Sequence, residues 1–343
     1  MRAVLLFVLG ILLTLAAGEV AFRLLPVSTA TRTGYEMHPH LLTYPAGHCF
    51  TTATGWDLRN AQNNCANNLG FIADHDFKPD SGAIALIGDS FIEANMLPPK
   101  DRLAAQLETR LGGKPVYAFG GPGSSLLDYA ERMKFAASRL GLRTFVVVVT
   151  RFDIREALCG SGNIHAVCFD PASQQVRLET QAPPGMLKRI VRESALAQYL
   201  FSQLKVNAES LAKILGRKAD SGPARRSTSD SVPALQSVVK LFFAEIAKIE
   251  DSRFYFVLEP PLPGATPPQP QPTESDLFRA GATAAHERII DASGRFEEFS
   301  AMTYLHLEVG PYDKHWNRAA VALIADAIVK ALAEAPTPGG DGH

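Results

Sequence analysis

The chain has 343 residues, of which 46% are hydrophobic and 20% charged, so it is long enough for one large α/β domain or two modest ones with a buried core. Its 34 basic and 35 acidic residues give a formal net charge of −1, and the clustered positive charge that nucleic-acid binding needs is lacking. One basic cluster, Arg225 and Arg226 with Lys218, falls in a polar stretch and is interpreted as a solvated loop. We therefore expect no nucleic-acid partner.

The N-terminus has the pattern of an export signal, because a basic start precedes an uncharged apolar run over residues 3–18. Small residues at the end of this run would suit a signal peptidase, with cleavage before Glu19 and a secreted product. Alternatively, the helix continues until Pro26, which approaches the ~20 residues that a membrane span needs. We predict a retained anchor over residues 1–26 in a bacterial inner membrane, with the rest of the chain in the periplasm.

The four cysteines agree with export. Cys49 and Cys65 are 16 positions apart, and Cys159 and Cys168 are 9 apart. Neither pair has Cys-x-x-Cys spacing and no histidines lie around them at the spacing of a zinc site, so a metal site is not expected. In an oxidising periplasm, two local disulfides are the simplest interpretation of these cysteines. Four buried free thiols are the alternative, and the sequence alone permits three pairings.

Residues 27–81 are polar and lack a clear periodic pattern, so we interpret them as a loop-rich lead-in held by the Cys49–Cys65 disulfide. The His38-Pro39-His40 and Asp74-His75-Asp76 triplets within it are more typical of surface loops than of ligand sets. Trp56 here, and Trp316 near the other end of the chain, are candidates either for a carbohydrate site or for the core.

From residue 82 to about 335 the pattern is that of a single α/β domain. Short apolar or β-branched runs predict buried strands, and apolar residues at helical spacing separate them. Strands followed by helices in this way predict a parallel sheet covered on both faces. The expected strands are 83–87, 116–119, 144–150, 254–258 and 288–290, and the expected helices are 103–111, 126–140, 186–215, 233–249, from about 275, and 317–333.

Three segments interrupt or end this pattern. We predict an insertion at about 155–232, which includes a Ser/Arg/Asp-rich linker at 217–231. A proline-rich stretch at 259–272 is interpreted as an extended loop. We expect residues 336–343 to form a disordered tail.

The first chemical motif is Gly88-Asp89-Ser90-Phe91, which follows the first predicted strand. Functional groups in an open parallel sheet gather beyond the carboxyl ends of the strands, and the start of a helix there offers free N–H groups. A serine at this point would be exposed and available for attack. Taken alone, however, Gly-Asp-Ser is more often an ordinary helix-capping turn.

The second motif is the glycine-rich turn at 120–125, which follows the next strand. Its backbone N–H groups could approach a ligand closely, or Ser124 or Ser125 could simply cap the following helix. No Lys-Ser/Thr pair follows, so the turn is not a phosphate-binding P-loop.

The third motif is Asp313-Lys314-His315, which precedes the last predicted helix. An acid two residues before a histidine on one loop can orient the imidazole so that it accepts a proton from a serine. An isolated Asp-x-His pair is more often found on the surface, and Asn317 could itself cap the helix.

Taken together, the three motifs resemble the SGNH/GDSL hydrolase family over roughly residues 82–333. The resemblance implies a flavodoxin-like, three-layer α/β/α fold with the serine in the first block and the Asp-His pair in the last. Asn68-Leu69-Gly70-Phe71 also resembles the Asn-x-x-Gly-Phe-Arg lead-in of membrane-anchored bacterial members, although Ile72 replaces the arginine. The apolar start that ends in Glu19 and Arg23 is similar to the anchors of those members.

The resemblance implies Ser90 as nucleophile, His315 as general base and Asp313 as the residue that orients it. The N–H groups of Ser90 and Gly123 would form part of the oxyanion hole. The family's third donor is an asparagine side chain after strand three, where this chain has Thr150-Arg151-Phe152-Asp153 with Phe152 at the asparagine position. Loss of one such donor typically costs about 10²–10³ in rate. Arg151 could replace the donor or could be turned away.

The resemblance therefore implies an esterase that acts on acyl groups, above all O-acetyl groups, of cell-envelope or exported polysaccharide. An O-acyltransferase and a catalytically degenerate domain that binds glycan or protein are the alternatives. No metal or organic cofactor is required. The expected partners are an acylated carbohydrate, the membrane and proteins of polysaccharide biosynthesis.

Overall fold

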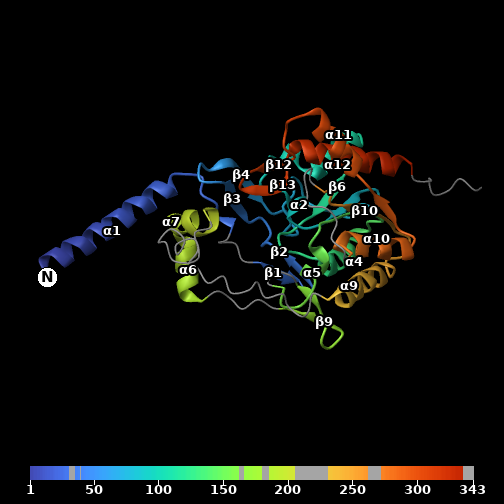
Figure 1. Ribbon diagram of the computed structural model, residues 1–343, viewed down its shortest axis with the longest axis horizontal. Helices are drawn as coiled ribbons and strands as arrows, with labels where there is room; N and C mark the ends of the chain where they lie inside the picture. Colours follow the sequence, from blue (N-terminus) through green and yellow to red (C-terminus); the bar gives the residue numbers. More distant parts are fainter. Residues whose placement is uncertain are drawn as a thin grey trace, which may run out of the picture.

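The computed structural model describes residues 1–30, 35–38, 40–161, 166–179, 185–204, 231–261 and 272–334. Its centre is a parallel sheet of five strands that pair in the order β11-β10-β7-β5-β6 (Figure 1). Numbered along the chain, this order is 2-1-3-4-5, which is the flavodoxin-like arrangement. The strands are β5 (Ile84–Ile87), β6 (Val116–Phe119), β7 (Thr144–Val149), β10 (Arg253–Leu258) and β11 (Arg288–Ile290). The predicted α/β fold with a parallel sheet is confirmed.

The central strands are largely apolar because helices cover both faces of the sheet. Every residue of β5 and β7 is buried. Alternate side chains of β5 enter opposite halves of the core, since Ala85 and Ile87 belong to one hydrophobic cluster and Ile84 and Leu86 to the other. The sheet is therefore the middle of three layers.

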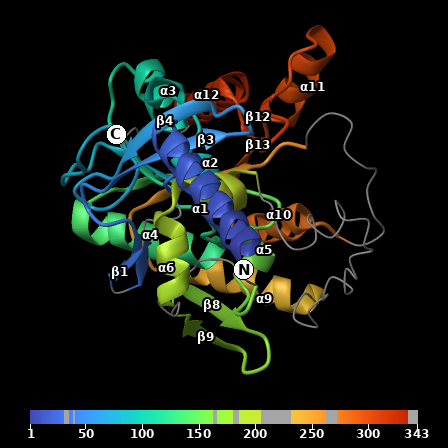
Figure 2. The same ribbon diagram turned by 90° about the vertical axis from the view of Figure 1, so that its left-hand side faces the viewer.

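The helices divide between these two faces, and Figure 2 shows α3 and α12 on one side of the sheet and α4, α9 and α10 on the other. The helix predicted over 126–140 has these bounds, whereas the one predicted over 233–249 begins and ends slightly earlier. The first group is α2 (Ser90–Glu93), α3 (Leu103–Arg110), α11 (Ser293–Met302) and α12 (Arg318–Ala333), and the second is α4 (Leu126–Leu140), α5 (Asp153–Glu156), α9 (Val232–Ile246) and α10 (Glu274–Ala284). A short 3-10 helix, Pro99–Asp101, precedes α3.

The lead-in is more regular than we expected. β1 (Glu36–His38) pairs with β2 (Leu41–Thr43), and β3 (Cys49–Thr54) pairs with β4 (Arg59–Cys65), both antiparallel. β4 is polar and mostly exposed, so it lacks the alternation of apolar residues by which a strand is recognised in a sequence. The prediction of an irregular segment was therefore wrong for these hairpins, which backbone hydrogen bonds and a disulfide hold together.

The insertion contains a hairpin that the sequence did not indicate, β8 (Val167–Asp170) with β9 (Gln175–Leu178). The helix predicted from Met186 is broken at Ser194 into α6 (Met186–Glu193), α7 (Ala195–Ala197) and the π-helix Gln198–Gln203. The remainder of that predicted helix, nearly all of the linker at 217–231 with its basic cluster, most of the proline-rich stretch and the tail at 336–343 lie outside the described residues. The domain boundaries stay predictions.

The chain begins with α1 (Arg2–Arg23), an apolar helix of 22 residues whose most apolar 18 residues have a mean hydropathy of 2.4. It is long and apolar enough to cross a membrane, and none of its most apolar residues is buried. It projects from one side of the molecule (Figure 1). Together with two disulfides, Cys49–Cys65 and Cys159–Cys168, this helix indicates an extracytoplasmic location.

Candidate active site

Ser90 lies at the carboxyl end of β5, next to the point where the strand order of the sheet reverses. It is the first residue of α2, and the Asp89 side chain caps this helix by accepting a hydrogen bond of 2.8 Å from the Phe91 N–H. The turn needs a residue without a side chain, because a Cβ atom on Gly88 would lie 2.5 Å from the Ile92 side chain. The tight turn thus places the Ser90 hydroxyl at the edge where ligands bind in sheets of this kind.

The structure brings Ser90, His315 and Asp313 together in one chain of hydrogen bonds. His315 Nε2 is 2.8 Å from Ser90 Oγ, and His315 Nδ1 is 2.6 Å from Asp313 Oδ1. The same Asp313 oxygen accepts the His315 backbone N–H at 3.0 Å. Because the Asp313 carboxylate accepts a hydrogen bond from the Nδ1–H group, the Nε2 atom is left as the acceptor that faces the serine.

Asp313 also determines the protonation behaviour of His315. Burial tends to lower the pKa of His315, but the hydrogen bond and negative charge of Asp313, assisted by Asp89 and Glu93, outweigh it, so the pKa is raised above its ordinary value. An imidazole with a raised pKa is a stronger base toward the serine proton.

The histidine lies on a strand and not on the loop that we expected. β13 (Asp313–Trp316) pairs with β12 (Glu308–Gly310), and this hairpin leads into α12. Asn317 caps α12 and donates from its side chain to the carbonyl oxygens of His306 and Glu308 at 2.6 and 3.1 Å. The cap therefore also fixes the hairpin that carries His315.

Two aromatic side chains support the imidazole. The Phe91 ring lies 4.8 Å from the His315 ring, and it contacts the Trp316 ring edge-on at 4.9 Å. Trp316 is buried, so of its two predicted roles the structure assigns the core. Trp56, by contrast, is exposed.

The residues that carry the candidate oxyanion donors, Ser90 and Gly123, line the same cleft. Gly123 lines the cleft with Ser90 and has a positive φ of 68°, which glycine adopts without strain. Within the described part of the chain, no protein acceptor takes the N–H of Ser90 or that of Gly123, whereas the Gly121 N–H donates to the Asp89 carbonyl at 3.2 Å. Two backbone donors are thus left for a ligand.

The segment after β7 has no side-chain donor in the expected place. Phe152 lines the cleft with 44% of its surface exposed, and guanidinium groups of Arg151 and Arg155 lie 5.2 and 5.3 Å from its ring centre. Arg151 is paired with Glu259, which accepts its backbone N–H at 3.0 Å and lies 3.5 Å from its guanidinium. Arg151 thus lines the cleft and is paired with a carboxylate. Its role as a substitute donor stays a prediction.

Asp153, the residue after Phe152, is buried under this segment. It accepts the backbone N–H and the hydroxyl of Thr150, both at 2.7 Å. Burial raises its pKa well above the ordinary value, and the charge of Asp89 adds to the effect. Burial likewise raises the pKa of Asp89 to about 6 and that of Glu93 to about 7. Three buried carboxyl groups of raised pKa thus lie beneath the candidate active site.

Arg132 is a supporting residue that the sequence analysis missed. Its buried guanidinium donates to the carbonyl oxygen of Gly88 at 2.7 Å, to that of Phe119 at 3.3 Å and to the Ser124 hydroxyl at 2.9 Å. It therefore ties together the ends of β5 and β6 and the glycine-rich turn. Its position among the apolar residues of the inner face of α4 is the signal that could have indicated it.

The cleft around Ser90 has a volume of about 570 Å³. Its wall combines polar groups with the exposed rings of Phe152 and Tyr312, and the exposed Trp56 follows the wall residue Gly55 directly in the chain. Tyr312 lies against Gly55, where a Cβ atom would be 2.7 Å from its ring. A cleft of similar volume beside His40 and Lys134 lies outside this site. Among the described residues, no group of three or more His, Cys, Asp or Glu side chains could hold a metal ion.

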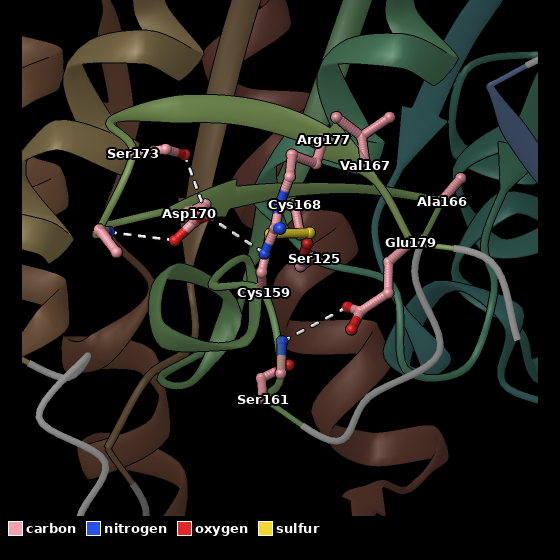
Figure 3. Close-up of a disulfide and its surroundings, with 12 residues drawn as sticks. Ser125, Cys159, Ser161, Ala166, Val167, Cys168, Asp170, Ser173, Arg177 and Glu179 are labelled. Carbon is pink, nitrogen blue, oxygen red and sulfur yellow. Dashed lines mark hydrogen bonds and ion pairs between the residues drawn. A yellow bond between two sulfur atoms is a disulfide. The ribbon is translucent and has the colours of Figure 1, made fainter.

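The remaining predicted residues have structural roles. Cys49 pairs with Cys65 and Cys159 with Cys168, as predicted. Figure 3 shows the second disulfide between the loop of Cys159 and strand β8, close to Ser125. His75 lies against Tyr117 and 3.6 Å from a carboxylate oxygen of Glu108. The side chain of His38 and the whole of Pro39 lie outside the described residues.

No known sequence family matches the chain, and no curated protein is similar to it in sequence. Solved structures with a similar fold include LAE5, an alpha/beta hydrolase enzyme from the metagenome of Lake Arreo, Spain, at 14% identity and a TM-score of 0.41, with 76% of this chain and 99% of that one covered. A lipolytic protein of the G-D-S-L family from Veillonella parvula has 9% identity and a TM-score of 0.40, with 74% and 99% covered. The acetyl xylan esterase AlAXEase has 12% identity and a TM-score of 0.38, with 73% and 99% covered. The chain is thus similar in fold, at low sequence identity, to hydrolases and lipolytic proteins.

Proposed function

We propose that this chain is a serine esterase of the SGNH type, with Ser90, His315 and Asp313 as its catalytic residues. The observation that carries the proposal is the unbroken chain of hydrogen bonds from Ser90 Oγ through the imidazole to Asp313. A serine at the carboxyl edge of a parallel sheet, next to a histidine of raised pKa, is the arrangement that nucleophilic catalysis of acyl transfer needs.

In the first half of the reaction, Ser90 Oγ attacks the ester carbonyl while His315 Nε2 takes the hydroxyl proton. Asp313 holds the imidazole in place and stabilises the imidazolium that forms. The N–H groups of Ser90 and Gly123 stabilise the oxyanion. His315 then returns the proton to the departing alcohol, and the acyl group stays on Ser90. In the second half, a water gives a proton to His315 and attacks the acyl carbonyl. His315 then returns this proton to Ser90 Oγ as the bond between Oγ and the acyl group breaks, and the acid leaves.

The substrate that we propose is an O-acetylated polysaccharide of the cell envelope or one that is exported. The exposed rings of Trp56, Phe152 and Tyr312 support this assignment, because the apolar face of a sugar ring packs well on an aromatic side chain. The volume of about 570 Å³ suits part of a glycan chain and is far more than a lone acetyl group needs.

We further propose that α1 is retained as the anchor in the inner membrane and that the catalytic domain faces the periplasm. Contacts at the candidate cleavage site support retention: Gly18 lies against Leu196, and the Glu19 carboxylate accepts the Ser194 hydroxyl at 2.7 Å. A periplasmic enzyme held at the membrane would work beside the proteins of polysaccharide biosynthesis. Cleavage before Glu19, which gives a secreted enzyme, is the alternative.

A second function, O-acyl transfer to a glycan hydroxyl, is favoured by Phe152. An apolar ring in the cleft excludes water and supplies no oxyanion donor, so it slows hydrolysis of the acyl-serine more than attack by a bound sugar hydroxyl. A catalytically degenerate domain that only binds glycan or protein is the third candidate, and the intact Ser90–His315–Asp313 set argues against it.

The proposed activity is tested with full-length protein and an O-acetylated polysaccharide, by following the release of acetate. An unacetylated oligosaccharide added to the same reaction, and analysed by mass spectrometry, reports transfer. Ser90→Ala should abolish both products, and the exposed Ser138→Ala serves as the matched control with unchanged rates. Neither product from the wild-type protein, or equal rates with Ser90→Ala, would refute the proposal.

A further inference from the structure

A part of the insertion lies against the membrane helix. This part, the α6–α7 segment (residues 185–204), comprises α6, α7 and the π-helix that follows them. Figures 1 and 2 both show α6 and α7 on the side of the molecule from which α1 projects. Their place in the fold puts them beside the point where α1 would leave a bilayer.

The α6–α7 segment is joined to the last turns of α1 by several contacts. The Glu19 carboxylate accepts the N–H groups of Ala195 and Leu196 at 3.0 and 3.1 Å, in addition to the Ser194 hydroxyl. The Phe22 ring stacks on the Tyr199 ring with 4.3 Å between their centres. The segment is therefore held at the end of the apolar helix and cannot move away from it without breaking these contacts.

The α6–α7 segment exposes large apolar side chains. Met186 and Ile190 are four residues apart, so they lie on one face of α6, and Val191 is next to them. Met186 and Ile190 have 72% and 61% of their surface exposed, and Val191, Phe201 and Leu204 are exposed as well. Such a surface is costly in water unless something covers it.

The composition of the segment favours a charged lipid surface as that cover. Its sequence has three basic residues, Lys188, Arg189 and Arg192, against one acid, Glu193. A helix that combines large apolar side chains with lysine and arginine is typical of helices that lie in the membrane interface, where basic residues meet anionic headgroups. The contacts of Ser194, Ala195 and Tyr199 with α1 place the part of the segment directly after α6 at the level of that interface.

We infer that the α6–α7 segment docks on the bilayer that α1 crosses, with its apolar side chains among anionic lipid headgroups. The inference rests on the proposed retention of α1 as an anchor. The enzyme would then be attached to the membrane at two places. The helix α1 holds the chain in the bilayer, and the α6–α7 segment fixes the orientation of the rest of the molecule relative to the bilayer.

Docking of this segment would also position the active-site cleft. The Tyr199 hydroxyl donates to the Trp56 carbonyl at 2.6 Å, and the Gln203 side chain donates to the Gly55 carbonyl at 2.8 Å. Gln203 and Gly55 both line the cleft that contains Ser90. A bilayer bound to the α6–α7 segment therefore holds the rim of the cleft near the membrane surface, where a membrane-bound or newly exported glycan would meet it.

The test uses the full-length protein reconstituted into vesicles of mixed phosphatidylglycerol and phosphatidylcholine. A cysteine is introduced as Ile190→Cys and labelled with an environment-sensitive fluorophore, which is practicable because all four native cysteines are in disulfides. Val176→Cys on β9 is the matched control, since Val176 is an exposed β-branched residue on a hairpin away from α1 (Figure 1). Brominated lipids in the vesicles then quench a label that enters the bilayer.

We expect a blue shift and several-fold stronger quenching at position 190 than at position 176, with a depth about 5–10 Å below the headgroups. Equal quenching at the two positions would overturn the inference. In vesicles of phosphatidylcholine alone, the quenching at position 190 should be weaker. Unchanged quenching in these vesicles would contradict the claim that the segment recognises anionic headgroups.

Two further readouts, one in cells and one on the reconstituted protein, separate this inference from the proposals on which it depends. Sequencing of the N-terminus in cells tests the anchor, and a chain that begins at Glu19 would overturn the docking proposal together with the anchor. Labelling of Ser90 by a fluorophosphonate tests the esterase. Quenching without labelling would support docking and count against catalysis, and labelling without quenching would do the reverse.

Discussion

The ends of two neighbouring strands, β5 and β7, face the same cleft but are equipped differently. The end of β5 carries Ser90, which is connected to His315 and Asp313 by hydrogen bonds of 2.8 and 2.6 Å. The end of β7 carries Phe152, whose apolar ring supplies no hydrogen-bond donor, and the neighbouring Arg151 is paired with Glu259. The β5 end therefore presents a complete hydrogen-bonded set of serine, histidine and aspartate, whereas Phe152 at the β7 end adds no side chain that could stabilise negative charge.

The two strand ends also differ in what holds them. Behind α2, the Asn95 carbonyl accepts the Thr52 hydroxyl at 2.7 Å and the Asn64 amide at 3.0 Å, so the β3–β4 hairpin with its Cys49–Cys65 disulfide supports the serine side. After β7 the chain passes through α5 to Cys159, whose disulfide partner lies on β8. The first disulfide thus supports the nucleophile, and the second supports the segment with the missing donor.

The largest effect should follow removal of the base. His315→Ala leaves the Ser90 hydroxyl without a proton acceptor, and we expect kcat/KM on a short acyl ester to fall by about 10⁶. His306→Ala, an exposed histidine just before β12, is the control and should leave kcat/KM unchanged. A loss of less than tenfold in His315→Ala would show that the β5 end works without this histidine.

Asp313→Asn should reduce kcat/KM by about 10⁴ because the imidazole loses the partner that fixes its orientation. It should also move the pH profile. The neutral imidazole is the active base, so wild-type activity should fall as the pH drops through the raised pKa of His315. Without Asp313, burial dominates and lowers that pKa, so the acid limb should shift to lower pH. An unchanged limb would mean that another group titrates.

Phe152→Asn tests the β7 end by supplying the missing donor. We expect turnover of a small chromogenic acetate to rise by up to ~10²-fold, measured as kcat. Phe152→Leu, which removes the ring but adds no donor, should give no comparable rise. Wild-type turnover of about 10 s⁻¹ or more would contradict the idea that Phe152 limits hydrolysis.

Removing the disulfides should affect stability more than chemistry. Replacing either pair with serines should lower the free energy of unfolding by about 2–5 kcal/mol in denaturant titrations. The separations of 16 and 9 residues predict a difference of only about 0.5 kcal/mol between the pairs from loop closure. The Cys49–Cys65 pair should nevertheless lower kcat more, since its hairpin supports Ser90. Equal losses of kcat would remove this distinction between the strand ends.

Much of the fold could be predicted because its signals are local. The run that forms β5 is apolar, the run that forms β7 is apolar after Thr144, and α4 has a clear helical period from Leu126 to Leu140. The three motifs that carry Ser90, Asp313 and His315 could also be found, since each directly follows or precedes such an element. That these motifs meet at one edge of the sheet could be expected, because functional groups in a parallel sheet gather beyond the carboxyl ends of its strands.

What could not be predicted depends on partners far apart in the sequence. The β3–β4 hairpin is polar and forms through pairing, and the role of Arg132 depends on carbonyl groups of two other strands. The orientation of Arg151 was left open by the sequence because its partner, Glu259, lies 108 residues further along the chain. The break at Ser194, likewise, coincides with a contact to Glu19 in α1.

The central claim is that Ser90 is an activated nucleophile, and fluorophosphonate labelling of the intact protein tests it most directly. We predict one covalent adduct, located on Ser90 by peptide mass spectrometry, which is lost in Ser90→Ala, strongly slowed in His315→Ala and retained in Phe152→Asn. No adduct on Ser90 in the folded wild-type protein, or the same adduct level in Ser90→Ala, would contradict the account and favour a domain that binds without catalysis.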